Sequence, residues 1–295
     1  MSIFKGSGVA LVTPFKDGKV NYEKLEELIN WHISNSTDAI IVCGTTGESA
    51  TLSTEEKKQV ITFAVEKTKG RVPLIAGTGG NNTEEVVKMS KFAESQGADG
   101  LLIVTPYYNK TTQRGIVNHY FTISDAVDVP IILYNVPGRT GLNIEPKTVA
   151  YLAERKNIIG IKEASADISQ VAQIANLCPE GFAIYSGNDD QIVPLLSLGG
   201  AGVISVVANI LPKETHDMVQ NYLDGDTDKA RDIQLKMLNV IDAMFIETNP
   251  IPVKTALNMM GMDVGELRQP LIEMEKQNRD SLAEALRDIG LEIKE

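Results

Sequence analysis

Short apolar runs alternate along this chain with longer amphipathic stretches. The runs are rich in Val, Ile and Leu, and the segment after each run has the spacing of a helix with one apolar face. Continuous apolar runs of this length are typical of strands that are buried on both faces of a parallel sheet. The runs lie at residues 9–13, 39–43, 72–76, 100–105, 130–135, 158–162, 182–186 and 202–206.

The amphipathic stretches carry the signals of helix starts. Asn21, Thr54 and Thr83 are capping residues, and each is followed by acidic residues that favour the first turn of a helix. Eight strands, each followed by a helix, predict a (β/α)8 barrel of the α/β class. An open doubly wound sheet is the main alternative, but it has fewer units and a nucleotide-binding loop after its first strand. Such a loop does not follow residues 9–13.

The alternation stops past about Pro212, and the remainder of the chain has only helical patterns. We therefore expect two domains. The first is the barrel, residues 1–225, which would carry the active site. The second is an all-helical C-terminal domain, residues 226–295.

Composition excludes several classes of function. The net charge of −11 disfavours nucleic acid as a partner, because an acidic surface repels phosphate backbones. The N-terminus lacks an apolar stretch long enough for a signal peptide or a membrane span, so we expect a cytoplasmic protein that contacts no membrane. The two cysteines and three histidines are scattered, so we expect no disulfide framework and no metal site.

In a barrel of this kind, the active site lies at the C-terminal ends of the strands. Lys162 ends the apolar run at 158–162, which would place its amine in or near the barrel mouth. Burial disfavours a charged ammonium, and a neutral amine can attack a carbonyl to form an imine. The alternative is a lysine whose stem packs on the strand while its head reaches solvent. Both interpretations stay open from the strand alone.

Other polar residues follow the neighbouring strands. Tyr134 ends the preceding strand and could transfer protons, with Thr45, Thr46 and Tyr108 as candidate links in a relay. Packing in a strand is the alternative role for Tyr134. Arg139 lies in the Pro-Gly turn beyond Tyr134 and suits carboxylate binding, although most isolated arginines are solvated surface residues. Asp190, which follows Asp189, is placed to cap the next helix.

Several segments together resemble the dihydrodipicolinate synthase family, within the superfamily of pyruvate class I aldolases that includes N-acetylneuraminate lyase. The resemblance covers nearly the whole chain from about residue 4. The segments are Gly-Thr-Thr-Gly-Glu-Ser at 44–49, Tyr-Tyr-Asn at 107–109, Tyr-Asn-Val-Pro-Gly-Arg-Thr at 134–140, Gly-Ile-Lys-Glu at 160–163 and Asn-Pro-Ile-Pro-Val-Lys at 249–254.

The resemblance implies a lyase that condenses pyruvate with L-aspartate 4-semialdehyde to 4-hydroxy-tetrahydrodipicolinate, the first committed step of diaminopimelate and lysine biosynthesis. Lys162 would form the Schiff base with pyruvate, so no cofactor is expected. Tyr134, Thr45 and Tyr108 would form the proton relay, with Tyr108 reaching into a neighbouring subunit of a homotetramer. Arg139 would bind the semialdehyde carboxylate. The pyruvate pocket would be lined by Thr45, Thr46, Gly187 and Ile204.

The resemblance also implies a regulatory site for lysine at a dimer interface. Two of its positions, often histidine in lysine-inhibited bacterial members, are Thr54 and Lys57 here. A fixed cation at Lys57 would repel the ammonium groups of lysine, so we expect weak or absent inhibition. The positions of this site are Ser49, Ala50, Thr54, Lys57, Asn81, Glu85 and Tyr107.

Two other functions stay open from the sequence. The first is another pyruvate-dependent class I aldolase, a lyase of N-acetylneuraminate or of a 2-keto-3-deoxy sugar acid, which would share Lys162 and Tyr134 but not the acceptor pocket. The second is a barrel without catalysis that binds a keto acid or serves as a scaffold. A metal-dependent aldolase fits less well, because the ligands are missing.

Overall fold

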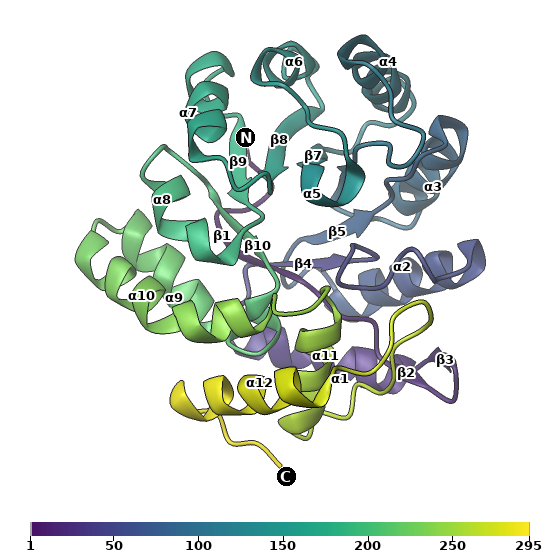
Figure 1. Cartoon of the computed structure of the whole chain (residues 1–295). Helices are drawn as coiled ribbons and strands as arrows, with labels where there is room; N and C mark the ends of the chain where they lie inside the picture. Colours follow the sequence, from purple (N-terminus) through teal and green to yellow (C-terminus); the bar gives the residue numbers. More distant parts are fainter. Residues whose placement is uncertain (1, 295) are drawn as a thin grey trace.

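The computed structural model describes residues 2–294, and its centre is a closed barrel of eight parallel strands (Figure 1). The order around the barrel is β1-β10-β9-β8-β7-β6-β5-β4, and β1 closes it by pairing with both β10 and β4. The predicted (β/α)8 architecture is therefore confirmed. The barrel strands are β1 (Gly6–Ala10), β4 (Ala39–Val42), β5 (Leu74–Gly77), β6 (Gly100–Val104), β7 (Ile131–Asn135), β8 (Ile158–Glu163), β9 (Ala183–Ser186) and β10 (Gly202–Ser205).

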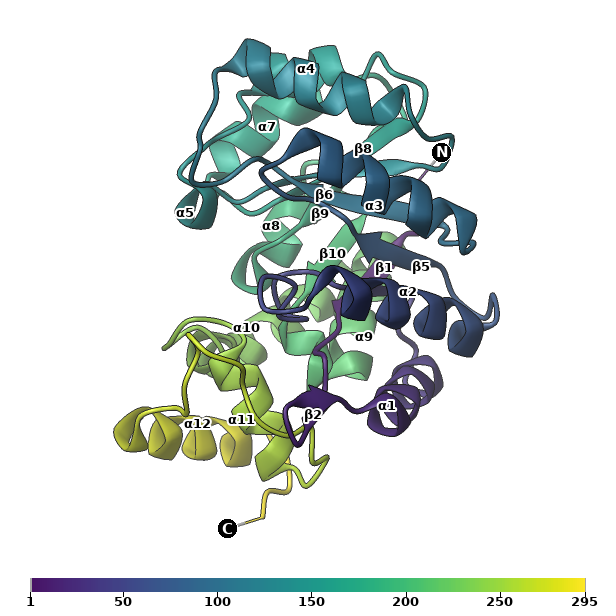
Figure 2. The same cartoon turned by 90° about the vertical axis from the view of Figure 1, so that its right-hand side faces the viewer.

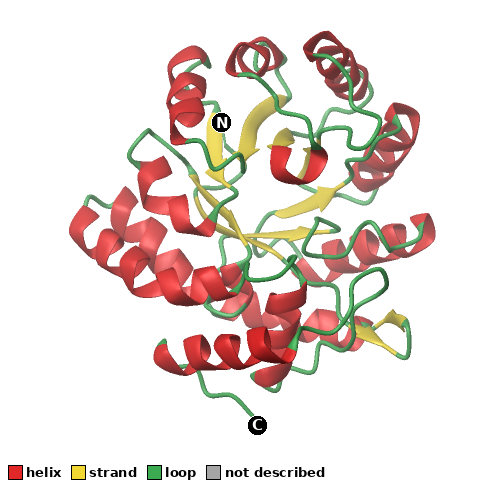
Figure 3. Ribbon diagram, viewed as in Figure 1, coloured by secondary structure: helices red, strands yellow, loops and turns green. Residues whose placement is uncertain are grey.

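Helices surround the strands (Figure 3). A hairpin, β2 (Phe15–Lys16) and β3 (Lys19–Val20), interrupts the chain before the first helix. The helices that follow the strands are α1 (Tyr22–Ser34), α2 (Thr54–Thr68), α3 (Thr83–Ser95), α4 (Gln113–Ser124), α5 (Pro137–Thr140), α6 (Pro146–Leu152), α7 (Ile168–Leu177), α8 (Ile192–Leu196) and α9 (Pro212–Leu223), with short 3-10 turns at η1 (Asp189–Gln191) and η2 (Val207–Asn209).

The first strand begins earlier than its apolar run predicts. The run at 9–13 places the strand too late, because β1 covers Gly6–Ala10 and starts with small residues. A Cβ on Gly8 would lie 2.8 Å from the Phe4 ring, so the tight interior of the barrel requires glycine there. Small residues at such a position give no hydrophobic signal, and this explains the shifted prediction.

The helix caps agree with the sequence at one start and differ by one residue at two others. Asn21 caps α1 by accepting a hydrogen bond from the Lys24 backbone N. The predicted capping residues of α2 and α3 are wrong. Ser53 caps α2 in a reciprocal capping box with Glu56, and Asn82 caps α3. In both helices the threonine that follows is the first helical residue.

The chain ends in three further helices: α10 (Thr227–Ala243), α11 (Ile251–Met259) and α12 (Lys276–Asp288). Helix α9 packs on β1 and completes the ring, and α10 packs on α9. The predicted boundary between residues 225 and 226 falls in the turn between α9 and α10. Helix α10 contacts α9 directly across this boundary. The division into two separate domains stays a prediction.

The two ends of the barrel differ. At the end where the strands begin, Phe4 stacks on Tyr185 with ring centroids 4.5 Å apart, and the Tyr185 hydroxyl donates to the Phe4 carbonyl at 2.8 Å. This pair closes the barrel interior on the N-terminal side. The short helix α5 lies on the opposite side from the N-terminus (Figure 2). The open end is therefore the one formed by the carboxyl ends of the strands.

Candidate active site

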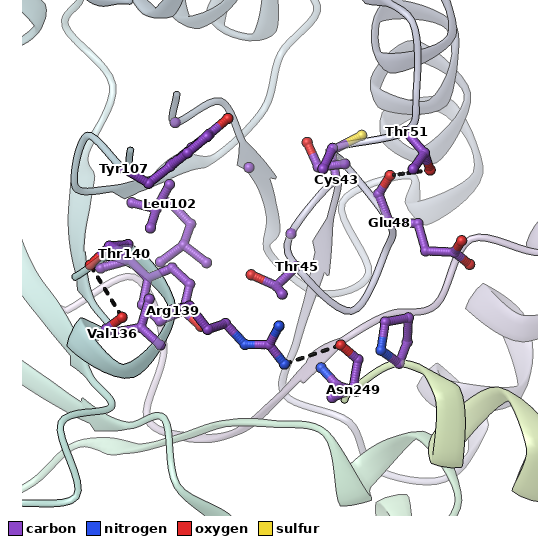
Figure 4. A pocket seen from close by; sticks show the side chains of 18 of the residues that line it. Cys43, Thr45, Glu48, Thr51, Leu102, Tyr107, Val136, Arg139, Thr140 and Asn249 are labelled. Carbon is purple, nitrogen blue, oxygen red and sulfur yellow. Dashed lines mark hydrogen bonds between the residues drawn. The ribbon is translucent and has the colours of Figure 1, made fainter. Parts of the chain in front are cut away.

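A cavity of about 310 Å³ opens at the carboxyl ends of β4 to β7 (Figure 4). Its walls come from the loops after these strands and from two stretches near the end of the chain, residues 248–250 and 270–271. Thr45, Tyr107, Tyr134 and Arg139 supply polar groups to it, and Leu102, Val104 and Val136 supply apolar surface. A concave, largely apolar site with a few polar groups is typical of small-molecule binding.

Lys162 and Tyr134 are neighbours on adjacent strands at this end of the barrel. They pair in register between β8 and β7, and the Lys162 Nζ lies 4.6 Å from the centroid of the Tyr134 ring. Both side chains are buried, with exposed fractions of 5% and 7%. The lysine side chain is largely shielded from solvent, so the structure contradicts the simple surface interpretation of Lys162 and brings its amine beside the Tyr134 ring.

Gly187 follows β9 and packs against the stem of Lys162. A Cβ at this position would lie 3.0 Å from Lys162 Cε and 2.6 Å from the Ala164 Cβ. The Gly187 backbone N donates to the Glu163 carbonyl at 2.7 Å. Glycine therefore leaves the space that the lysine side chain needs.

The two threonines after β4 face different surroundings. Thr45 is half-buried and lines the cavity, where Figure 4 shows its side chain pointing toward the Arg139 guanidinium across the open space. Thr46 is buried, and its hydroxyl accepts a hydrogen bond from Asn249 Nδ2 at 3.0 Å. Only Thr45 has its side chain in the cavity wall, while Thr46 connects this turn to the C-terminal part of the chain.

Arg139 extends from α5 across the mouth of the cavity, and its Nη2 donates to the Asn249 carbonyl at 3.1 Å (Figure 4). One hydrogen bond to a neutral carbonyl leaves most of the guanidinium donors for another acceptor. The position therefore suits recognition of a ligand carboxylate.

Several predicted residues are not among those that line this cavity in a single chain: Thr46, Tyr108, Lys162, Gly187 and Ile204. Ile204 is fully buried in β10, where it pairs with Gly8. Tyr108 is 93% exposed and is not part of the cavity lining within residues 2–294. A contribution of Tyr108 to the site of a neighbouring subunit stays a prediction.

The predicted regulatory residues divide between two adjoining cavities. Ser49 and Ala50 line the cavity described above, while Thr54, Asn81 and Glu85 line a second one of about 400 Å³. Lys57 and Tyr107 line both. Burial lowers the pKa of Lys57 below that of an ordinary lysine.

A buried carboxylate directly after Lys162 was not predicted as part of the site. Glu163 is 2% exposed, and its two oxygens accept hydrogen bonds from Asn135 Nδ2 at 3.0 and 3.2 Å, Gln170 Nε2 at 3.1 Å and the Ser165 backbone N at 2.7 Å. Burial raises the pKa of Glu163, and these hydrogen bonds oppose the effect. The sequence signal that could have identified Glu163 is an acidic residue at the end of an apolar strand.

Asn135 extends this cluster, which we call the Glu163 cluster, to the loop after α5. Asn135 Nδ2 also donates to Asn143 Oδ1 at 2.8 Å, and its Oδ1 accepts from the Ile144 backbone N at 3.0 Å. Because Asn135 and Glu163 pair in register beside Tyr134 and Lys162, the cluster fixes the two strands that carry those groups.

The predicted capping role of Asp190 is wrong. Asn188 precedes η1 and Gln191 precedes α8, neither with a side-chain cap, and Asp190 is exposed. The buried Asp189 instead accepts hydrogen bonds from the Val206 and Val207 backbone N atoms, both at 3.0 Å. Asp189 therefore anchors the loop after β10.

Metal ions and lipid bilayers each require particular structural features, which concern residues 2–294 here. No cluster of three or more His, Cys, Asp or Glu side chains in this range has a geometry suited to a metal ion. None of the helices in the same range combines the length and the apolarity that crossing a bilayer requires.

Comparison with known proteins gives full-length matches. Residues 3–289 match the model of the dihydrodipicolinate synthetase family. The 4-hydroxy-tetrahydrodipicolinate synthase of Clostridium novyi (strain NT) is 61% identical over 286 residues, which cover 97% of each chain. The crystal structure of dihydrodipicolinate synthase from Aquifex aeolicus has a TM-score of 0.97 at 47% identity and covers 99% of this chain and 100% of its own. A structure described as the first monomeric dihydrodipicolinate synthase variant has a TM-score of 0.96 at 44% identity, covering 98% of each.

Proposed function

The chain belongs to the dihydrodipicolinate synthetase family, and on this premise we propose how its site condenses pyruvate with L-aspartate 4-semialdehyde to 4-hydroxy-tetrahydrodipicolinate. This reaction is the first committed step of diaminopimelate and lysine biosynthesis. The names of the close relatives support this reaction over the lysis of N-acetylneuraminate or of sugar acids, and over a barrel without catalysis.

One observation carries the mechanism: the buried Lys162 amine lies 4.6 Å from the ring centre of Tyr134. In its neutral form, Lys162 Nζ attacks the C2 carbonyl of pyruvate, and loss of water gives an imine. Loss of a C3 proton converts the imine to an enamine. The C3 carbon then forms a bond to the aldehyde carbon of the semialdehyde, whose oxygen takes up a proton.

Ring closure releases the enzyme. The amine of the former semialdehyde attacks the C2 imine carbon, and the C2–Nζ bond breaks to return the Lys162 amine. The protonated imine takes up the electrons of the C3–H bond, the enamine passes them to the aldehyde carbon, and the imine that forms again accepts the attacking amine, so we propose that the reaction needs no cofactor.

Protons must move at each of these steps, and Tyr134 would transfer them, which its position beside Lys162 supports. Thr45 lines the same cavity and would continue the relay, and Tyr108 would complete it from a neighbouring subunit. Thr46, Gly187 and Ile204 would form the surroundings of pyruvate. Arg139 would hold the carboxylate of the semialdehyde at the mouth, where its guanidinium has free donors.

Borohydride reduction tests the imine directly. With pyruvate present, the peptide that contains Lys162 should gain the mass of the reduced adduct. Lys162→Met should gain none, and Lys213→Met, which changes an exposed lysine of α9, should be labelled like the wild type. Formation of product from added aspartate semialdehyde then tests the acceptor. An unmodified Lys162 in an active enzyme would contradict the mechanism.

We propose a homotetramer, a dimer of dimers, in the cytoplasm. Support for a second subunit comes from Tyr107 and Tyr108, two large aromatic side chains that are exposed beside the cavity in the single chain. Light scattering of the purified protein measures the assembly. A stable monomer with full activity would contradict the role of Tyr108, and the monomeric relative makes this a real alternative outcome.

We further propose weak or absent inhibition by lysine, because Lys57 places a cation among the residues of the expected regulatory site. The measurement is activity against added lysine. Half-inhibition below about 1 mM, the upper end of ordinary enzyme affinities, would contradict the proposal.

A further inference from the structure

Two residues from segments of the resemblance have no part in the proposed chemistry, and they meet in the structure. Glu48 ends the glycine-threonine turn after β4, and Lys254 lies in α11. Lys254 Nζ lies 2.8 Å from Glu48 Oε1, and the exposed fractions of the two side chains are 1% and 0%. The pair joins the barrel to the C-terminal helices.

Both partners have further hydrogen bonds that fix them. The Lys254 ammonium also donates to the carbonyls of Thr13, at 3.2 Å, and Glu266, so all three of its protons have acceptors. Its Nζ lies 4.4 Å from the centre of the Phe15 ring. The second oxygen of Glu48 accepts from the Arg268 backbone N at 3.0 Å. Because every donor of this buried pair has an acceptor, the two side chains have one arrangement. The pair can therefore hold the two segments that carry it in a fixed relative position.

The pair fixes the position of the turn after β4, which contains Thr45 and Thr46. The Glu48 backbone N donates to the Thr45 carbonyl at 3.1 Å, which makes Glu48 part of the same turn as the cavity-lining threonine. Glu48 has a φ of 52°, a left-handed conformation that a glutamate adopts only when its surroundings hold it there. On the other side of the turn, Asn249 Nδ2 donates to the Thr46 hydroxyl.

Asn249 and Lys254 therefore hold the turn at two points, and both belong to the same C-terminal segment. The carbonyl of Asn249 also accepts the hydrogen bond from Arg139. One segment thus contacts both the turn that carries Thr45 and the arginine across the mouth.

We propose that the Lys254–Glu48 pair is a positioning device, through which the C-terminal helices set Thr45 at the reacting groups. Lys254 is a positioning residue, since it is buried outside the residues that line the cavity. The proposal rests on the proposed condensation, because Thr45 matters only if it takes part in that reaction.

A double-mutant cycle tests this connection. Lys254→Met keeps an unbranched side chain that is one atom shorter and removes the ammonium, and it should lower kcat by about 10- to 100-fold, the size of effect expected when a catalytic group is displaced by about 1 Å. If Lys254 acts through Thr45, adding Lys254→Met to Thr45→Val should lower kcat by at most about 3-fold more. Losses that simply multiply would overturn the proposal. Lys213→Met is the matched control, and its effect should be near 1-fold in both backgrounds.

A second variant separates positioning from stability. Lys254→Met combined with Glu48→Gln removes both charges, and it should recover much of the thermal stability that either single change loses. Activity should remain low, since the link to the turn is gone. Recovery of kcat together with stability would overturn the proposal. If Lys254→Met alone does not fold, the double variant Lys254→Met, Glu48→Gln replaces it in the cycle with Thr45→Val. Losses of kcat that simply multiply would again overturn the proposal.

The failure of this proposal can be told apart from failure of the proposed function. Borohydride trapping and condensation by the wild-type enzyme come first, and their absence counts against the function. Independent effects of Lys254 and Thr45 in an active, trappable enzyme count against the positioning role alone.

Discussion

Glu163 and Glu48 are two carboxylates buried at the same end of the barrel, but different kinds of partner hold them. Glu163 accepts hydrogen bonds from two side-chain amides and one backbone N, all of them neutral. Glu48 pairs with the Lys254 ammonium. The Glu163 cluster lies within one stretch of the barrel, whereas the Glu48 pair connects the barrel to a segment 206 positions later in the chain.

The difference teaches how each connection can respond to change. Burial raises the pKa of Glu163, so its carboxylate is the form that the interior disfavours. Burial lowers the pKa of Lys254, and Glu48 opposes this effect. If one member of the ion pair is removed, the charge of the other stays buried without a counter-charge. If an amide partner of Glu163 is removed, only hydrogen bonds are lost. The ion pair should therefore be the less tolerant of single substitutions.

The largest expected effect is the loss of the cation. Lys254→Met should lower the free energy of unfolding by about 3–5 kcal/mol, because the Glu48 charge then remains buried without its partner. Urea denaturation followed by circular dichroism measures this. A loss of less than about 1 kcal/mol would remove the distinction between the two carboxylates.

A smaller effect is expected from Glu163→Gln. The substitution keeps the shape but brings an amide NH₂ group against the donors of Asn135 and Gln170, at a cost of about 1–3 kcal/mol. Adding Asn135→Asp returns an acceptor to the pair and should restore part of the stability. The same denaturation curves show whether it does, and a loss that equals or exceeds that of Lys254→Met would reverse the ranking.

The pH dependence should have opposite signs for these two groups. Between the pKa of an unfolded glutamate, about 4.3, and its raised folded value, Glu163 keeps a proton that the unfolded chain has lost. Its contribution to stability is therefore complete below that range and is lost as the pH rises through it. Wild type should lose stability relative to Glu163→Gln over this range, as measured by denaturation at a series of pH values.

Lys254 should act below the pKa of an unfolded lysine. Between its lowered folded pKa and about 10.4, the folded chain has lost a proton that the unfolded chain still holds, so rising pH favours folding. Wild type should gain stability relative to Lys254→Met over this range. Changes in stability of the same sign for Glu163 and Lys254 would contradict the directions given above.

The smallest effect is expected at the surface. Lys213 pairs with Asp217 on α9, where both side chains are largely exposed. Lys213→Met should leave the melting temperature and the kinetics of condensation unchanged within error. A clear shift in either would show that charge removal alone accounts for part of the Lys254→Met effect.

Much of the barrel follows from local pattern. The eight apolar runs predicted the eight strands, and the polar residues at their carboxyl ends included Lys162, Tyr134, Thr45 and Arg139, which lie around one end of the barrel. Such predictions succeed because a strand buried on both faces needs a continuous apolar run. They fail where burial is achieved with small residues, as in β1.

The supporting contacts could not be predicted in the same way. That Asn135 meets Glu163 depends on the register between β7 and β8, which includes an irregularity at Ile131 and Ile132. That Glu48 meets Lys254 depends on how the C-terminal helices fold back on the barrel. Both are properties of the assembled tertiary structure, and residue types in a single sequence do not encode the spatial neighbour of a polar side chain.

The cavity wall has a consequence for synthesis of the protein. Residues 248–250 and 270–271 complete a pocket whose other walls come from residues 43–140. A nascent chain on the ribosome therefore carries Lys162 and all eight strands while one wall of the pocket is still untranslated. Binding competence should appear abruptly, only after the final fifth of the polypeptide has left the exit tunnel.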